Sequence, residues 1–293
     1  MFLTRIVCGL LLIVGTGAQA ENATPVNIVT AQGSYAAMAR TIGAGHVKVV
    51  TLARRAGADV RVLEADSRAS RAIAEADIVV VNGLGLDAAL ALAVQKNPGA
   101  RPRTVLDASV LGRHIILPDD NSYLFYSPRI MLLMASRLSD TLAERDPAHG
   151  AAYRQGLERF RSQLQPVYAQ VLALISDYPD IAVLTATPLY AYMLDLLGYR
   201  DDHAITRDRH YASPLRINKA ADDMRRHRIR LFLYERDARD GWTRQQIRIS
   251  RKAQIPVAAI DDMLAVGESY ADWQARQLRA IKTALDEHTT VGA

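Results

Sequence analysis

The sequence predicts an α/β protein of two lobes, each a parallel sheet flanked by helices, with one long helix joining the lobes and a ligand cleft between them. Short β-branched runs alternate with helical patterns along most of the chain. These apolar runs show no polar alternation, which is typical of strands covered on both faces in a parallel sheet. A long amphipathic segment separates a first set of runs from a second set.

Residues 1–20 have the pattern of an export signal. Arg5 precedes the apolar stretch IVCGLLLIV, and AQA (18–20) is a small-residue cleavage site. The apolar stretch is too short to span a membrane. Cys8 lies inside this stretch rather than just after it, so we expect a soluble exported chain without a lipid anchor, cleaved before Glu21.

The composition narrows the chemistry of the mature chain. Cys8 is the only cysteine, so its loss with the signal leaves no disulfide, thiolate ligand or cysteine nucleophile. The 36 basic residues exceed the 31 acidic ones, but they are spread along the chain without interleaved aromatics, which argues against nucleic-acid binding. We interpret the group RRHRIR (225–230) as a solvated helix face and the strand after it, with a binding patch as the alternative.

The first lobe, residues 21–145, contains four predicted strands. Their runs are VNIVT (26–30), VKVVTL (47–52), ADIVVVNG (76–83) and TVLDAS (104–109). Helical patterns follow the first three, from Ser34, in SRASRAIAEA (67–76) and from Asp87. This alternation predicts βαβ units.

A linking helix is predicted over residues 146–177. Asp146 suits its N-cap and Pro147 its first position. Apolar residues follow at steps of four and three: Tyr153, Leu157, Phe160, Leu164, Val167, Val171 and Ile175. At 1.5 Å per residue such a helix is about 45 Å long, enough to run the height of two lobes.

The second lobe, residues 178–293, repeats the scheme of the first. Its strand runs are IAVLTAT (181–187), IRLFLYE (229–235) and IPVAAID (255–261), each with a helix behind it. The last helix starts at about Glu268 and turns Trp273, Leu278 and Ile281 toward the core. Because α/β proteins bind ligands at the carboxyl ends of parallel strands, we expect a cleft where the two sheets face each other.

The stretch GADVRVLEADSRASRAIAEADIVVVNGLGLD (57–87) resembles the motif GADPHxYEPTPSDxxALxxADLVVxNGLGLE. That motif is typical of the periplasmic substrate-binding proteins of zinc- and manganese-type ABC importers. The order of elements, the linking helix and the final ESYADWQARQLRAIKTAL (268–285) are similar to that family too. The resemblance implies a periplasmic, non-enzymatic protein that delivers a metal-containing ligand to an ABC permease in the inner membrane; we expect a monomer.

The resemblance also locates the metal ligands of the family. The histidine of DPH falls on Arg61, and that of NPHxWLDP falls on Tyr123 in NSYLFYSP. The histidine of SHDAFGYF falls on Thr187 in ATPLYAYM, with a proline after it in place of the family's aspartate. The last ligand, an aspartate after the final strand, is kept as Asp261. Three imidazoles are therefore replaced and one carboxylate remains.

Arg61 cannot ligate a cation, because a guanidinium keeps its proton and has no acceptor atom. One hypothesis is an ion pair with Asp261 or Glu235, with the guanidinium standing where the cation would lie. Another is that Arg61 binds an anionic ligand, such as a carboxylate-rich metal chelate. Plain surface charge is the third interpretation.

A bare divalent or ferric ion would need a rebuilt site. Asp261 and Tyr123 offer oxygen ligands, and Glu235 ends a strand at the expected cleft edge. His203 and His210, in RDDHAITRDRHY (200–211), would replace two of the lost imidazoles. The plainer interpretation of that segment is a solvated polar loop.

A metal chelate or metallophore, such as a ferric chelate, is the second hypothesis for the ligand. Arg61 and Thr187 would contact its polar groups. Aromatic residues near two former ligand positions would either stack on it or pack in the core. These are Tyr123, Phe125, Tyr126, Tyr190 and Tyr192. A third hypothesis closes the cleft with the Arg61 ion pair and makes the protein a periplasmic accessory or chaperone.

Signatures of enzymes are weak in this sequence. NGLGLD (82–87) has two close glycines after a strand, but it lacks the third glycine and the later acidic residue of a nucleotide fingerprint. The sequence shows neither a nucleophile elbow nor an H-E-x-x-H motif. We predict no resident cofactor, only a transported metal ion or chelate. An exported hydrolase is the enzymatic alternative, which turnover of generic esters and peptides would detect.

Overall fold

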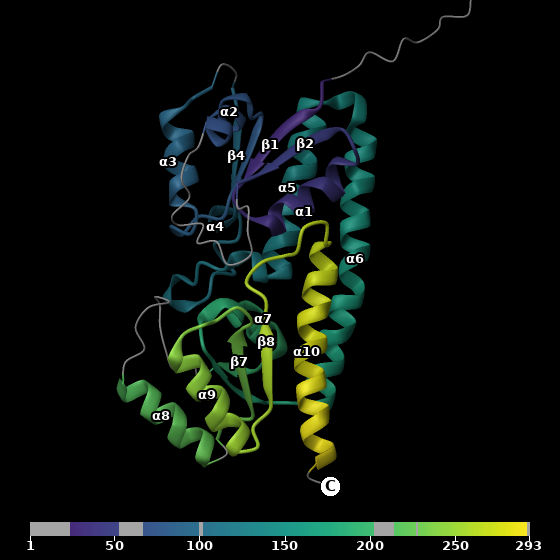
Figure 1. Cartoon of the computed structure of the whole chain (residues 1–293). Helices are drawn as coiled ribbons and strands as arrows, with labels where there is room; N and C mark the ends of the chain where they lie inside the picture. The colour runs from purple at the N-terminus through teal and green to yellow at the C-terminus, as the bar shows by residue number, and fades with distance from the viewer. Residues whose placement is uncertain (1–23, 53–66, 100–101, 202–213, 227, 292–293) are drawn as a thin grey trace, which may run out of the picture.

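The computed structural model describes residues 24–52, 67–99, 102–201, 214–226 and 228–291. Arg61, His203 and His210 lie outside the described residues. Figure 1 shows two lobes stacked end to end, with the helix α6 (Gly150–Asp177) running along one flank of both and the helix α10 (Tyr270–Val291) lying beside it along the C-terminal lobe. The two-lobed α/β prediction is confirmed.

The N-terminal lobe holds a four-stranded parallel sheet in the order β2-β1-β3-β4. Its strands are β1 (Val26–Thr30), β2 (Val47–Thr51), β3 (Ile78–Val81) and β4 (Thr104–Asp107). Its helices are α1 (Gly33–Gly43), α2 (Ser67–Glu75), α3 (Ala88–Lys96) and α4 (Ala108–Leu111). All four residues of β3 are buried, as a strand covered on both faces must be.

A segment of short turns leads from this sheet to a helix that the sequence reasoning missed. The 3-10 turns are η2 (Pro118–Asp120) and η3 (Leu124–Tyr126), and the helix is α5 (Pro128–Arg145). The Oγ of Ser127 accepts a hydrogen bond from the N–H of Ile130 at 3.3 Å, and Pro128 follows at the first helical position. This cap, the following proline and the apolar residues spaced by three and four along the helix were the available sequence signals.

The predicted linking helix is α6 (Gly150–Asp177), preceded by the 3-10 turn η4 (Pro147–His149). Asp146 does not cap α6, because its carboxylate accepts hydrogen bonds from Tyr153 at 2.5 Å and lies 2.7 Å from His149 Nδ1. The apolar stripe is buried as predicted up to Val171, but Leu174 rather than Ile175 completes it. At 28 residues the helix is about 42 Å long.

The C-terminal lobe holds a second four-stranded parallel sheet, in the order β6-β5-β7-β8. Its strands are β5 (Ala182–Thr185), β6 (Arg200–Asp201), β7 (Leu231–Glu235) and β8 (Val257–Ile260). The 3-10 turn η5 (Pro188–Tyr190) and the helices α7 (Ala191–Leu197), α8 (Pro214–Arg225), α9 (Gly241–Lys252) and α10 (Tyr270–Val291) complete it. The two-residue edge strand β6 was not predicted.

One hydrophobic core extends through both lobes. It contains Ile28 and Val80 from the first sheet, Val183 and Leu233 from the second, and the buried face of α6. Two smaller clusters fill the far sides of the sheets, one under α2 and α3 and one under α8 and α9. Among the described helices, none is both long and apolar enough to cross a membrane.

Candidate functional site

The predicted ligand positions that the structure describes lie where the two lobes meet. Thr187 follows β5, Glu235 is the last residue of β7 and Asp261 directly follows β8, so all three stand at the carboxyl edge of the second sheet. Tyr123 precedes η3 in the segment that joins the first sheet to α5. The tertiary structure thus gathers residues that are far apart in the sequence.

Asp261 has both carboxylate oxygens bound by arginines. Arg236, which directly follows β7, donates from Nε to Oδ1 at 2.6 Å. Arg276, in α10, donates from Nη1 to Oδ2. The side chain of Asp261 is 15% exposed, whereas that of Arg236 is 51% exposed. Guanidinium groups therefore do bind the carboxylate of Asp261, as one hypothesis proposed for Arg61. The residues that supply them, Arg236 and Arg276, belong to the C-terminal lobe.

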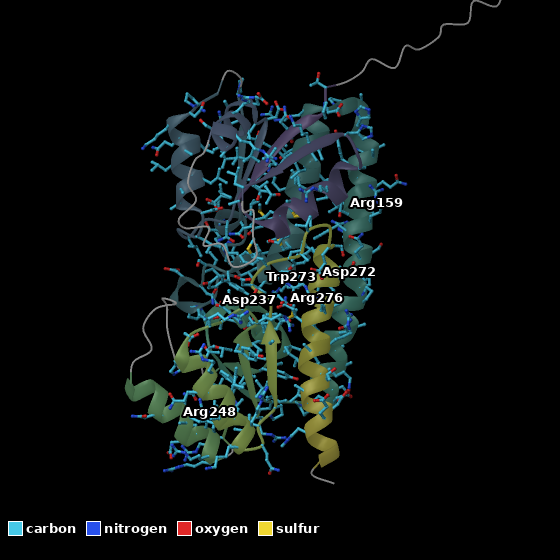
Figure 2. All side chains as sticks on the ribbon, viewed as in Figure 1. Arg159, Asp237, Arg248, Asp272, Trp273 and Arg276 are labelled. Atoms are coloured by element: carbon cyan, nitrogen blue, oxygen red, sulfur yellow. The ribbon has the colours of Figure 1, made fainter. Side chains whose placement is uncertain are left out.

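Arg276 is itself fixed by a second carboxylate. Its Nε and Nη2 donate to the two oxygens of Glu268 at 3.0 and 2.9 Å, a bidentate fork. These hydrogen bonds, and then the charge of Asp261, raise the pKa of Arg276 above its ordinary value despite partial burial. Figure 2 shows Arg276 on α10 near the level at which the lobes meet. The network therefore forms a connected chain of two carboxylates and two guanidinium groups.

The backbone of Asp261 is held as well. Its N–H donates to Oε1 of Gln277 at 3.1 Å, and its carbonyl accepts a hydrogen bond from the hydroxyl of Tyr126 at 2.6 Å. Tyr126 is fully buried, and this burial raises its pKa well above the ordinary value of a tyrosine. The bond to Tyr126 ties the second sheet to the η3 segment of the first lobe.

The aromatic residues near the former ligand positions are part of the core. Tyr123, Phe125, Tyr126, Tyr190 and Tyr192 are each 8% exposed or less. Phe125 and Tyr126 contact the ring of Trp273, at centroid distances of 6.2 and 4.9 Å. In this arrangement the rings pack on one another, which is the plainer of the two roles expected for them.

Thr187 and Glu235 line a small cavity at the carboxyl edge of the second sheet. Its volume is about 10 Å³, room for about one water molecule. The wall of this cavity is formed by Thr185, Thr187, Leu189, Tyr190, Leu233, Tyr234, Glu235 and Ile260. Glu235 therefore lines a cavity whose wall comes from the C-terminal lobe, and its role as a ligand contact stays a prediction.

The NGLGLD segment of the N-terminal lobe is hydrogen-bonded to the residue before Tyr123. The carboxylate of Asp87 accepts hydrogen bonds from the N–H groups of Asn82 at 2.5 Å and Gly83 at 3.1 Å. Burial raises the pKa of Asp87, and these hydrogen bonds oppose the rise. The side chain of Asn82 in turn accepts from Tyr35 at 3.0 Å and donates to the carbonyl of Ser122 at 2.8 Å. The loop is thus hydrogen-bonded to the backbone next to Tyr123. Because the N–H groups of Asn82 and Gly83 already donate to Asp87, they are not available to bind a phosphate.

Further hydrogen bonds connect the two lobes. The side-chain amide of Asn121 donates to the carbonyl of Pro188 at 2.8 Å. The hydroxyl of Tyr192 donates to the carbonyl of Asn121 at 2.7 Å. With the bond between Tyr126 and Asp261, these contacts hold the lobes in one relative position.

Sequence reasoning missed Arg236, Arg276 and Glu268. Arg236 follows Glu235 directly, so its place beside a strand end was the only signal available. Among the residues that the structure describes, no three or more His, Cys, Asp or Glu side chains form a group that could hold a metal ion. Of the family ligands that the resemblance predicts, the described part of the site therefore contains one carboxylate, Asp261, and both of its oxygens are bound by arginines.

Comparison with known proteins places this geometry in a family. Residues 28–284 match the family model described as zinc-uptake complex component A, periplasmic. No curated protein matches the chain. Among solved structures, FpvC of P. aeruginosa in complex with Ni²⁺ shares 20% identity at a TM-score of 0.75, covering 90% of this chain and 97% of its own.

Two other structures show the same likeness. The Mn-bound periplasmic metal-binding protein of Candidatus Liberibacter asiaticus is 18% identical at a TM-score of 0.73, covering 88% of this chain and 98% of its own. A structure of ZnuA is 18% identical at a TM-score of 0.72, covering 90% and 98%. At these identities the structures support the fold, while the family model spans nearly the whole chain. The chain therefore belongs to the periplasmic zinc-uptake complex component A family, the extracytoplasmic solute-binding proteins of metal-type ABC importers.

Proposed function

We propose that this solute-binding protein captures an anionic metal chelate rather than a bare divalent cation. The observation that carries the proposal is that Arg236 and Arg276 bind both oxygens of Asp261. A bare cation at this carboxylate would have to displace two guanidinium groups, and it would find no imidazole at the positions of Tyr123 and Thr187. Zinc and manganese sites normally need several such ligands.

Arg236 is the residue best suited to receive the anionic part of a chelate. Its Nε holds Asp261, and half of its side chain remains exposed to solvent. A guanidinium has five N–H donors in a planar fork, so Arg236 can bind Asp261 and a ligand carboxylate at the same time. Thr187, at the same edge of the sheet, offers an uncharged hydroxyl group as a further contact for the chelate.

The relatives support a metal-containing cargo. The similar structures are described as complexes with Mn, Cd and Ni²⁺ ions. We infer that this chain keeps the metal as cargo but takes it inside a chelate, for which Arg61 would be a further contact from the opposite lobe. His203 and His210 stay predictions in this picture, and neither is required by it.

We infer the other parts of the proposed function from the family and from the export-signal pattern of residues 1–20. The chain carries a leader of residues 1–20 that is removed on export to the periplasm, and it acts there as a monomer without enzymatic activity. It delivers its ligand to an ABC permease of the inner membrane. The extent of its leader and its monomeric state are testable by mass spectrometry and sedimentation of the secreted chain.

The experiment is calorimetric titration of metal-stripped protein with zinc, manganese and ferric citrate. We expect ferric citrate to bind more tightly than either bare ion. Arg236→Gln should weaken ferric citrate at least about tenfold, since a charge-assisted hydrogen bond contributes about 1.5–3 kcal/mol. Arg248→Gln is the control, because it removes an equal charge from an exposed position on α9.

Two outcomes would contradict the proposal. Bare zinc or manganese binding at micromolar or better concentration, lost in Asp261→Ala but kept in Arg236→Gln, would show an ion site. No binding of any of the three probes would favour the accessory protein with a closed cleft.

A further inference from the structure

The end of the C-terminal lobe that lies away from the N-terminal lobe carries a dense group of basic side chains. We define this group as the basic end: Arg225, Arg226, Arg228, Arg230, Arg248, Arg251 and Lys252. All seven are exposed. Figure 2 shows Arg248 on α9, and blue nitrogen atoms gather below α8 and α9 in the same view.

Three elements converge to form the basic end. The hydroxyl of Ser250 in α9 donates to the sulfur of Met224 in α8 at 3.3 Å, which brings the carboxyl ends of these two helices together. Arg230 directly precedes β7, whose Phe232 pairs in register with Val257 of β8 shortly after α9. The apolar cluster of α8, α9 and the second sheet lies beneath and fixes this arrangement.

Most of the positive charge of the basic end is not neutralised locally. Arg225 and Arg226 pair with Asp222, at 3.4 and 2.9 Å, and Arg228 pairs with Asp223 at 3.4 Å. In the part of the chain that the structure describes, no carboxylate lies within ion-pair distance of the other four residues of the basic end. The helix α9 itself contains no acidic residue.

The basic end lies at the opposite edge of the second sheet from the ligand site. Arg230 stands before the first residue of β7, whereas Glu235 is its last. Five strand residues span about 17 Å. A partner bound at the basic end therefore leaves Asp261 and its arginines accessible from the lobe boundary.

We propose that the basic end is a docking surface for anionic phospholipid membranes. The guanidinium group of an arginine binds two phosphate oxygens at once. Each basic residue close to an anionic membrane surface contributes about 1 kcal/mol of attraction. The group extends over two helices and a strand end, and arginine dominates it. A broad charged face of this kind fits a laterally mobile layer of headgroups better than a single acidic peptide. Contact with the membrane would confine the search for a membrane-embedded permease to two dimensions.

The experiment is co-sedimentation of the protein with vesicles at low salt. One set of vesicles is phosphatidylcholine mixed with phosphatidylglycerol in equal parts, and the other is phosphatidylcholine alone. We expect binding to the first set only, lost at about 1 M salt, where the Debye length falls to about 3 Å. The triple variant Arg248→Gln, Arg251→Gln, Lys252→Gln should bind at least about tenfold more weakly.

A matched triple variant separates the local effect from total charge. Arg154→Gln, Arg159→Gln and Arg161→Gln remove the same charge from exposed positions on α6, and this variant should bind as the parent does. Equal loss in both variants, or no binding of the parent to anionic vesicles, would overturn the proposal. Binding to polyglutamate but not to vesicles would overturn it too, and would assign the surface to an acidic protein instead.

Discussion

Asp261 stands where the resemblance predicts a metal ligand, and its carboxylate oxygens each accept a hydrogen bond from a different arginine. The carboxylate is the ligand type that the resemblance predicts, but its neighbours change its charge environment. An isolated carboxylate attracts cations, whereas one bound by two guanidinium groups leaves excess positive charge beside it. The ligand preference of the site therefore depends on Arg236 and Arg276 more than on Asp261 itself.

Asp146 and Tyr153 provide a test of a single, partly buried hydrogen bond. The hydroxyl of Tyr153 donates to the carboxylate of Asp146 at 2.5 Å. Burial alone would raise the pKa of Asp146, but the hydrogen bonds from Tyr153 and His149 lower it overall. We expect Tyr153→Phe to lower the free energy of unfolding at pH 7 by about 1.5–3 kcal/mol, measured by urea denaturation.

The pH dependence of this effect has a defined sign. Because the folded-state pKa of Asp146 is depressed, its stabilisation is fully present above the unfolded pKa of about 3.9 and is lost as pH falls through the folded pKa. The penalty of Tyr153→Phe should therefore shrink below about pH 4. Tyr190→Phe is the control, since the buried hydroxyl of Tyr190 has no hydrogen-bond partner among the described residues. A penalty as large in Tyr190→Phe would contradict the assignment.

The helices α1 and α6 approach each other closely at one point, and this contact places the first lobe on the linking helix. A Cβ at Gly156 of α6 would come within 2.7 Å of the Cα of Ile42 in α1, and closer still to its carbonyl oxygen. These are backbone atoms that cannot rotate away. Glycine is therefore required here by the packing of one helix on another rather than by its own dihedral angles.

We expect Gly156→Ala to destabilise the protein by about 1–3 kcal/mol, because the added methyl group forces the two helices apart. Thermal unfolding measures the change. Gly150→Ala, on the same helix, is the control: its Cβ would lie 3.5 Å from the nearest atoms, an ordinary contact. Alanine there should be neutral or stabilising by up to about 1 kcal/mol, since glycine is a poor helix former. Similar losses in both variants would contradict the close-approach argument.

At the level of the whole molecule, the two lobes share one core and several hydrogen bonds. The core passes from the first sheet through α5, α6 and α10 to the second sheet, and Tyr126 and Tyr192 add bonds across the boundary. Such a structure resists wide separation of the lobes. We infer that ligand capture involves small lobe motions rather than a wide hinge opening.

A shared core also predicts cooperative unfolding. Trp273 is fully buried in the shared core, whereas Trp242 packs against the outer cluster of the C-terminal lobe. In Trp242→Phe, the fluorescence of Trp273 and the far-UV circular dichroism should give the same urea midpoint, as expected for a two-state transition. A second transition seen by circular dichroism alone would mean that one lobe unfolds independently.

Residue patterns were sufficient for the local elements of this protein. Seven of the eight strands that the structure describes lie within the predicted apolar runs, because strands of a parallel sheet covered by helices are rich in apolar residues. The helix α6 was visible from its apolar spacing. By contrast, β6 is too short to show a pattern, and the sequence reasoning missed α5 although Ile130, Met134 and Leu138 recur at helical spacing.

The sequence by itself determined the two-lobed fold and the family, since both follow from residue types in order along the chain. It did not determine the partners of Asp261. Arg236 and Arg276 are 25 and 15 positions away from it in the sequence. The pairing of β7 with β8 brings Arg236 to Asp261, and the packing of α10 beside β8 brings Arg276 there. The same holds for Ile175 and Leu174, whose exposure depends on how α6 is rotated against its neighbours. Side-chain partners across separate elements are set by tertiary geometry, which no local periodicity encodes.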